Sequence, residues 1–355
     1  MPQPISPLPS PSPAVTIADI ARVCGVSSAS VSRVLNGLPG VNAAKRKQML
    51  EVANNLGYRP NRAAQRLVNQ KSHLLGFIAS DLRNTAYLEY FYTLERAMRK
   101  DGYEFLIADS ERSAQREQAN IERMLDNRVD GLLILPVSDW VGPGEVSHLK
   151  QLSASALPCV LFGELRGLKL DSVSNDERFA AALLVRHLYD LGHRHLGFVG
   201  ISELQNRPAK QRLDGVKAAL SARNIAPSTL RTLTAHTPGW IDRLLAWFRE
   251  PTPPTAVICV DDLLALSLIR PLQTDGLIIP RDVALCGFGK SMIAETVMAE
   301  LSSPSLTRVE FDHPLVAENG AAMLLERIAK PGLAPRTVYL PSTLVAREST
   351  GAHRA

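Results

Sequence analysis

Short apolar runs alternate with longer amphipathic stretches from Leu74 to Cys286, and this alternation restricts the fold more than any other feature. We expect strands at 74–79, 103–108, 131–135, 159–162, 196–199, 256–260 and 283–286. The amphipathic stretches that predict helices include 87–100, 177–191, 212–223 and 262–274. Regular alternation of strand and helix requires parallel sheets with helices on both faces. The number of strands indicates an α/β region made of two doubly wound units.

Residues 15–60 show a different pattern, with three short helices joined by tight turns. Thr16, Ser27 and Asn42 stand where they can cap these helices, and Gly25 can end the first one. A short helix that braces a second helix with small or basic outer residues is typical of a helix-turn-helix DNA-binding unit. The alternative from spacing alone is a three-helix domain with a solvated face.

The distribution of charge favours the DNA-binding interpretation. The chain has 40 Lys and Arg and 35 Asp and Glu, but residues 1–72 hold nine basic residues against two acidic ones. The whole positive excess therefore lies in one segment, as expected of a segment that meets a polyanion. Arg33 lies on the outer face of the predicted second helix, where a guanidinium can pair with a guanine edge.

Several classes of protein are excluded by what the sequence lacks. Its four cysteines are far apart and match no metal-site spacing, so we expect free, mostly buried thiols and no metal or cofactor. No apolar run has the length of a membrane span, and residues 1–14, rich in proline, predict a disordered tail and not an export signal. We therefore expect a cytoplasmic protein with no membrane partner.

Two features resemble enzyme sites. Residues 284–291, ALCGFGKS, nearly match a phosphate-binding loop, but Ala284 replaces the first glycine. His193 and His195 have no carboxylate or cysteine partner nearby in sequence, so we expect structural surface histidines. We predict that the protein is not an enzyme. A phosphate-loop nucleotide-dependent enzyme and a solute-binding protein fused to a basic oligomerisation module remain the alternatives.

At this point the residues resemble a known family, the lactose/galactose repressors (LacI/GalR). The resemblance is carried by residues 15–36 (VTIADIARVCGVSSASVSRVLN), 56–67 (LGYRPNRAAQRL), 128–134, 191–198, 212–216, 260–266 and 280–288, in family order. It implies an all-α helix-turn-helix headpiece at 15–60, a hinge helix and linker at 61–73, and a periplasmic-binding-protein-like core at 74–355. It places one subdomain at about 74–173 and 305–335 and the other at about 174–304 and 336–348, with chain crossings near 174, 305 and 335.

The resemblance also implies a repressor that binds a palindromic double-stranded DNA operator as a homodimer and is released by a small sugar or sugar-acid effector. Carried over position by position, the operator contacts are Thr16, Ser27, Ser28, Ala29, Ser32, Arg33, Asn36, Asn61, Ala64 and Leu67, the last a candidate minor-groove wedge. The implied effector contacts are Tyr87, Glu164, Asn175, Arg212, Asp261 and Lys290. Because residues 348–355 are short and polar, we predict a dimer and not a tetramer.

The residues after Gly287-Phe288 suggest the charge of the effector. Relatives with neutral sugar effectors usually carry Asp there, whereas this chain has Gly289 followed by Lys290, as in the gluconate-repressor branch that it resembles. A lysine near Arg212 favours an anion, so we expect a sugar acid such as gluconate, or a phosphorylated sugar, over a neutral sugar. A solvent-facing Lys290 is the alternative.

Overall fold

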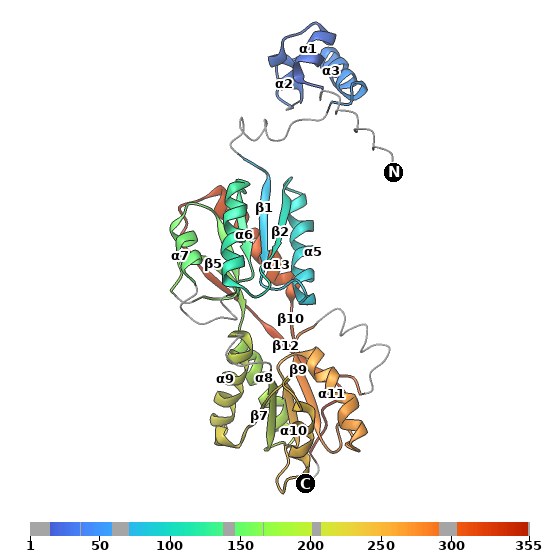
Figure 1. Cartoon of the computed structure of the whole chain (residues 1–355), viewed down its shortest axis with the longest axis vertical. Helices are drawn as coiled ribbons and strands as arrows, with labels where there is room; N and C mark the ends of the chain where they lie inside the picture. Colours follow the sequence, from blue (N-terminus) through green and yellow to red (C-terminus); the bar gives the residue numbers. More distant parts are fainter. Residues whose placement is uncertain are drawn as a thin grey trace, which may run out of the picture. The chain divides into compact units, whose positions relative to one another are not determined.

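The computed structural model describes residues 15–35, 37–58, 71–137, 146–165, 167–200, 207–290 and 304–353 (Figure 1). The chain divides into two compact units, residues 1–72 and 73–355. The predicted tail at 1–14, Asn36 and the hinge residues Asn61, Ala64 and Leu67 lie outside the described residues.

The first unit contains the three helices expected from the sequence, α1 (Ile17–Cys24), α2 (Ser28–Leu35) and α3 (Ala43–Asn55). At the start of α1, the Asp19 backbone N–H donates to Thr16 Oγ1 while the Thr16 N–H donates to the Asp19 carboxylate, a reciprocal capping box. Gly25 ends α1 in the left-handed conformation at φ +63°. The Asn42 side chain accepts from the Ala44 N–H and caps α3.

A small common core holds these helices together. It consists of Ile20, Ala21, Val31, Val34, Met49 and Ala53, all buried. Each helix contributes two of these residues, so the displacement of any one helix would expose apolar surface.

The second unit, called the core below, contains two six-stranded sheets. The first sheet has the order β11-β5-β4-β3-β1-β2, and every pair in it is parallel. Its strands are β1 (Leu74–Ala79), β2 (Glu104–Asp109), β3 (Gly131–Ile134), β4 (Cys159–Phe162), β5 (Asp171–Asn175) and β11 (Thr337–Leu340). Helices cover both faces, with α5 (Thr85–Arg99) and α13 (His313–Ala329) on one, and α6 (Ala114–Asp126) and α7 (Ser147–Ala154) on the other.

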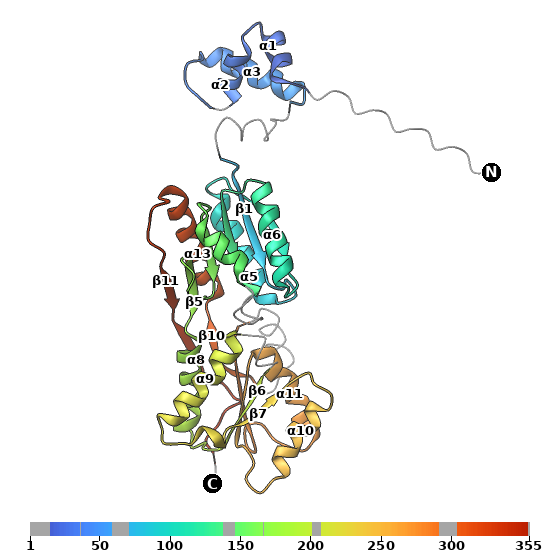
Figure 2. The ribbon, with the colours of Figure 1, turned by 60° about the vertical axis from the view of Figure 1, so that its left-hand side comes forward.

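The second sheet has the order β12-β10-β9-β8-β6-β7. Its strands are β6 (Leu196–Gly200), β7 (Arg231–Thr234), β8 (Ala256–Cys259), β9 (Ala284–Phe288), β10 (Thr307–Phe311) and β12 (Ser342–Val345). Its helices are α8 (Glu177–Asp190), α9 (Arg207–Ser221), α10 (Trp240–Ala246) and α11 (Asp262–Thr274). Figure 2 shows α8 and α9 on one side of this sheet and α10 and α11 on the other. Strand β12 runs antiparallel to β10, so this sheet is not wholly parallel.

Within the described residues, the chain crosses between the two sheets three times, at Asp176, Asp312 and Pro341. The expected crossings near 305 and 335 were therefore placed too early. Strand β10 belongs to the second sheet and β11 to the first, because the chain completes each strand before it crosses. We call the parts built on the first and second sheets the first and second subdomains.

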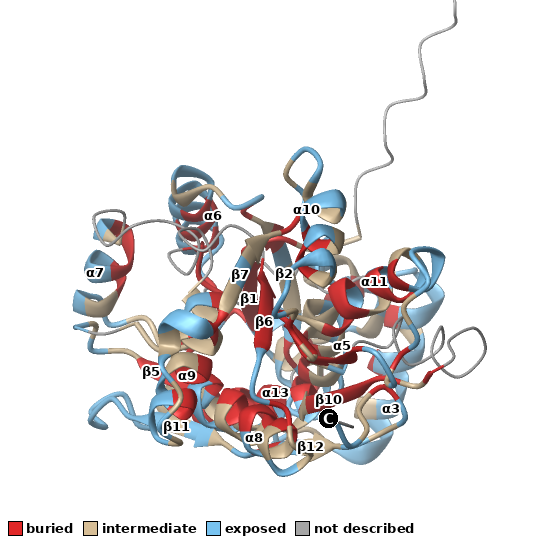
Figure 3. Cartoon of the chain, turned by 90° about the horizontal axis from the view of Figure 1, so that it is seen from below, coloured by how far each residue is buried: buried red, intermediate tan, exposed pale blue. Residues whose placement is uncertain are grey.

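Buried residues concentrate on the strands and on the inner sides of helices such as α6 and α11 (Figure 3). The apolar runs predicted from the sequence are strands in the structure, whereas β5, β7, β10, β11 and β12 were missed. Strand β11, for example, has no fully buried residue and so no continuous apolar run. Helix α9 begins at Arg207, earlier than expected. Within the described residues no helix is long and apolar enough to cross a membrane.

Candidate functional site

Helix α2 has one buried face and one exposed face, as a DNA-reading helix requires. Val31 and Val34 are buried at 0% and 3% exposure, while Ser28, Ala29 and Arg33 are exposed. Ser32 lies half-buried between the two faces. The structure thus brings the small residues and the guanidinium together on the outer side of α2.

The turns beside α2 hold further predicted contact residues. Ser27 is exposed just before α2, and its hydroxyl lies 2.9 Å from that of Ser30 and accepts from the Ser30 N–H. The exposed Thr16 hydroxyl donates to Asp19 at 2.7 Å. A Cβ at Gly40, where φ is +105°, would lie 3.1 Å from Arg33 Nη1, so this glycine leaves room for the guanidinium.

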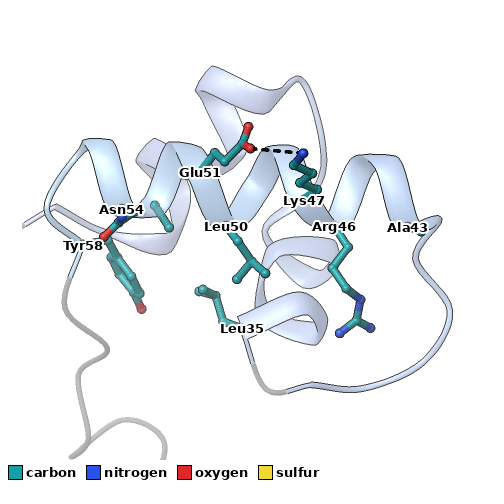
Figure 4. Close-up of a pocket in the computed structure, with 9 residues that line it drawn as sticks. Leu35, Ala43, Arg46, Lys47, Leu50, Glu51, Asn54 and Tyr58 are labelled. Carbon is teal, nitrogen blue, oxygen red and sulfur yellow. Dashed lines mark ion pairs between the residues drawn. The ribbon is translucent and has the colours of Figure 1, made fainter.

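A shallow hollow of about 610 Å³ lies along α3 (Figure 4). Leu35, Leu50 and Tyr58 contribute apolar surface, and Lys47 pairs with Glu51 at 4.0 Å. None of the predicted operator contacts among the described residues lines it. It is therefore a feature separate from the α2 face.

The core holds a second cavity, of about 380 Å³, between the two subdomains. All six predicted effector contacts line it: Tyr87, Glu164, Asn175, Arg212, Asp261 and Lys290. They come from both subdomains, on helices, loops and one strand, and they range from Tyr87 to Lys290 in the sequence. The fold thus gathers the residues that the resemblance singled out into one cavity.

Arg212 is the most constrained of these side chains. Its guanidinium donates to both Glu177 carboxylate oxygens, at 2.7 and 3.2 Å, and to the Val260 carbonyl at 2.6 Å. It also lies 5.0 Å from the ring centres of both Phe288 and Phe311. This arrangement holds the guanidinium in one orientation, and Glu177 offsets its charge.

Three of the predicted residues offer hydrogen-bond acceptors to the cavity. Asn175 Oδ1 is buried and accepts no hydrogen bond from the described residues. Glu164 accepts the Tyr339 hydroxyl at 2.7 Å, and Asp261 caps α11 through the Leu264 N–H. Acceptors of this kind suit a ligand that carries several hydroxyl groups.

Lys290 lines the cavity and is also part of an ion-pair cluster. Its ammonium lies 3.5 Å from Glu310, which also pairs with the buried Arg308 at 2.8 Å and with Arg347 at 3.5 Å. The side chain of Lys290 is 46% exposed. The lysine therefore faces both solvent and the cavity, with its charge shared by Glu310.

Sequence reasoning missed a second ionic cluster at the cavity, formed by Asp81, Arg83 and Arg112. Arg83 binds the Asp81 carboxylate through two nitrogens, at 2.9 and 3.0 Å, and Arg112 Nε lies 2.7 Å from it. The hydrogen bonds from Arg83 lower the pKa of Asp81. The sequence did contain a signal for this cluster. Asp81 follows the carboxyl end of the buried strand β1, and ligand sites of parallel sheets lie at the carboxyl ends of the strands.

The two histidines singled out by sequence behave differently. His195 is exposed, as expected, but His193 is buried at 2% exposure, which corrects the prediction of a surface side chain. Its ring contacts the Thr255 hydroxyl and the Gly351 carbonyl, each at 3.0 Å, and burial lowers its pKa.

Among the residues that the structure describes, no cluster of three metal-ligating side chains occurs. The cysteines are free, and all but Cys24 are buried.

Comparison with known proteins identifies the family. Residues 16–61 match "Bacterial regulatory proteins, lacI family", and residues 185–350 match "Periplasmic binding protein-like domain". Catabolite control protein A of Priestia megaterium is 31% identical over 340 residues, which cover 95% of this chain and 99% of that protein. This chain belongs to the lacI family.

A second relative and a solved structure are similar to this lacI-family chain over nearly its whole length. The ribose operon repressor of Haemophilus influenzae is 28% identical over 336 residues, which cover 94% of this chain and 98% of the repressor. The crystal structure of the lac repressor dimer bound to operator and the anti-inducer ONPF has the same fold. It has a TM-score of 0.83 and 24% identity, and the match covers 96% of this chain and 100% of that one.

The family assignment determines the general activity. This lacI-family chain is a DNA-binding transcriptional regulator with a periplasmic-binding-protein-like effector domain, and it is not an enzyme. The alternative of a phosphate-loop enzyme is therefore wrong. The similarity to the gluconate-repressor branch stays a prediction.

Proposed function

We propose that this regulator is a repressor that binds a palindromic operator as a homodimer in the cytoplasm and is released by a small polyhydroxylated effector. The observation that carries the proposal is the separation of two sites in one chain. An exposed face of α2 presents Arg33, while a polar cavity lies in the core.

On the DNA side, Arg33 reads a base and the small residues around it allow α2 a close approach to the major groove. The proposed contacts among the described residues are Thr16, Ser27, Ser28, Ala29, Ser32 and Arg33. Exposure of the Arg33 guanidinium supports this role, because bidentate pairing with guanine needs an accessible fork of N–H donors. Asn36, Asn61, Ala64 and Leu67 complete the proposed interface.

On the effector side, the cavity suits a sugar or a sugar acid. Asn175, Glu164 and Asp261 supply acceptors for hydroxyl groups, and Tyr87 supplies a ring face. Two solved structures with this fold contain a sugar: a LacI-family transcriptional regulator from Enterococcus faecium with bound ribose, and the complex of the transcriptional regulator CelR with cellobiose. Gly289 and Lys290 favour an acidic or phosphorylated sugar over a neutral one.

A gel-shift experiment with the region upstream of the protein's own gene tests the proposal. The expected result is a specific complex with a palindromic fragment that a sugar or sugar acid dissociates. Binding that is equal for this fragment and a scrambled one, or that no sugar changes, would contradict it.

Sedimentation tests the proposed homodimer. A single species with the mass of two chains is expected at micromolar concentration. A stable tetramer or a monomer would refute this part of the proposal.

A further inference from the structure

The core cavity contains a histidine that is not among the predicted effector contacts. His313 lines the cavity, and no other histidine of the described residues does so. It is the first residue of α13, directly after the crossing at Asp312, and it is 8% exposed. A polar side chain that is so deeply buried normally has hydrogen-bond partners. The partners of its two ring nitrogens therefore show what His313 can offer to a ligand.

One of the two ring nitrogens is occupied. Nδ1 of His313 lies 3.3 Å from a carboxylate oxygen of Glu89, on α5. An ionised carboxylate only accepts hydrogen bonds, so the proton of the imidazole lies on Nδ1. In the neutral ring the lone pair is then on Nε2, and the described residues provide no hydrogen-bond partner for this atom. Nε2 is therefore an acceptor that is available to a ligand.

Aromatic contacts hold the imidazole ring in place. Its centre lies 5.3 Å from the ring centre of Tyr90, with 35° between the two planes. Tyr90 in turn contacts Phe162 edge to face at 5.0 Å, and both of these rings line the cavity. The orientation of His313 is thus set before a ligand binds, which lowers the entropy cost of binding.

The charged and titratable groups near His313 come from several elements. Besides Glu89, α5 contributes Tyr90, and burial raises the pKa of this tyrosine, so it stays neutral. Glu177 on α8 and Arg212 on α9 act on the same tyrosine and are paired with each other. Asp312 caps α13 by accepting the Leu315 N–H. Among these kinds of group, only an imidazole ordinarily changes its charge near neutral pH.

We propose that His313 is an effector-binding residue and that its Nε2 accepts a hydrogen bond from a hydroxyl group of the ligand. Glu89 is a positioning residue, because it keeps the proton on Nδ1 and leaves the lone pair on Nε2. The buried Asn175 Oδ1, which also lines the cavity and has no described partner, accepts a second hydroxyl. This inference rests on the proposed sugar or sugar-acid effector and adds one requirement, a hydroxyl donor at His313.

Calorimetric titration of the full chain with D-gluconate, D-glucose and glucose 6-phosphate at about pH 8 tests the contact. His313→Phe keeps a ring but has no acceptor, so the affinity for the ligand that binds most tightly should fall about tenfold. His313→Gln keeps an amide oxygen within reach of the Nε2 position, so the affinity should stay within about threefold of the wild type. Circular dichroism of each variant verifies the fold.

The pH dependence of binding gives a readout that a purely structural role would not change. A protonated imidazole donates from both nitrogens and no longer accepts. Wild-type affinity for D-gluconate or D-glucose should therefore fall by about threefold or more between about pH 8 and 5.5, and His313→Gln should remove this decrease. The charge of these two ligands is constant in this range. Glucose 6-phosphate titrates in the same range and is compared at pH 8 only.

His195→Gln is the matched control, because His195 is exposed and does not line the cavity. It should change neither the affinity nor its pH dependence. Unchanged affinity in His313→Phe, an equal loss in His313→Phe and His313→Gln, or an affinity for D-gluconate that rises as the pH falls would each overturn the hydroxyl contact. If the wild-type protein binds none of the three ligands, the proposed sugar or sugar-acid effector is itself wrong, and the contact with it.

Discussion

Gly215 on α9 offers a test of the packing that positions the effector cavity. An ideal Cβ at this position would lie 2.8 Å from the Ala181 Cβ and 2.9 Å from the Arg178 Cα, both on α8. Carbon atoms in contact prefer about 3.5–4.0 Å, so Gly215→Ala must separate the two helices by about 1 Å. Part of the obstacle is backbone, which cannot rotate away.

Two effects of Gly215→Ala oppose each other, and their magnitudes predict the sign. Alanine has a higher helix propensity than glycine by about 1 kcal/mol. Overpacking costs about 1–3 kcal/mol, and contact with backbone favours the upper end. We therefore expect the core to lose about 2 kcal/mol of unfolding free energy.

Urea unfolding at fixed protein concentration, followed by the fluorescence of Trp240 and Trp247 in the core, measures this change. The exposed Ala218 lies on the same helix, and Ala218→Gly supplies the control for propensity, with an expected loss of about 1 kcal/mol. A Gly215→Ala variant that is more stable than the wild type by about 1 kcal/mol would refute the packing argument.

The same substitution has a functional consequence. Helix α8 carries Glu177 and α9 carries Arg212, so a shift between the helices changes the geometry of their two-nitrogen ion pair. Effector affinity is expected to fall together with stability. Unchanged effector affinity in a destabilised variant would show that the contact between α8 and α9 does not influence the effector cavity.

Three further predictions follow from the described residues. Arg33→Ala should cost about 1–3 kcal/mol of operator affinity in a gel shift and leave binding to scrambled DNA nearly unchanged; an equal loss on both would assign Arg33 to the phosphates. Glu177→Gln should weaken effector binding measured by calorimetry, because Arg212 loses its charge partner. Unchanged affinity would show that the Arg212–Glu177 ion pair does not contribute to effector binding. Burial lowers the pKa of His193, so the unfolded chain binds the proton more readily than the folded chain. The contribution of the neutral His193 to folding stability is therefore complete above about pH 6.5 and is lost as the pH decreases below that value. His193→Gln should flatten this decrease in melting temperature between about pH 7.5 and 5.5, and an unaltered pH profile would show that other groups cause it.

Much of the architecture could be predicted because it depends on local patterns. The caps at Thr16 and Asn42, the left-handed Gly25 and the apolar faces of α1 and α2 are set by residues within a few positions of each other. The buried strands of both sheets are continuous apolar runs, which only a doubly covered parallel sheet accommodates. The six cavity residues were found through the resemblance, and spacing alone does not place them together.

The tertiary structure decided what depends on partners that are distant in sequence. Strand β10 lies in the second subdomain and β11 in the first, the reverse of the sequence-based expectation. The reason is that pairing with β9 and with β5, and not the composition of each strand, determines the sheet that it joins. The charge of the cavity is decided in the same way. The sequence shows Arg212 and Lys290 as two cations, but Glu177 and Glu310 offset them only after folding. In the same way, Arg83 and Arg112 share the carboxylate of Asp81 only after folding, because electrostatic pairing depends on distance in space and not on separation along the chain.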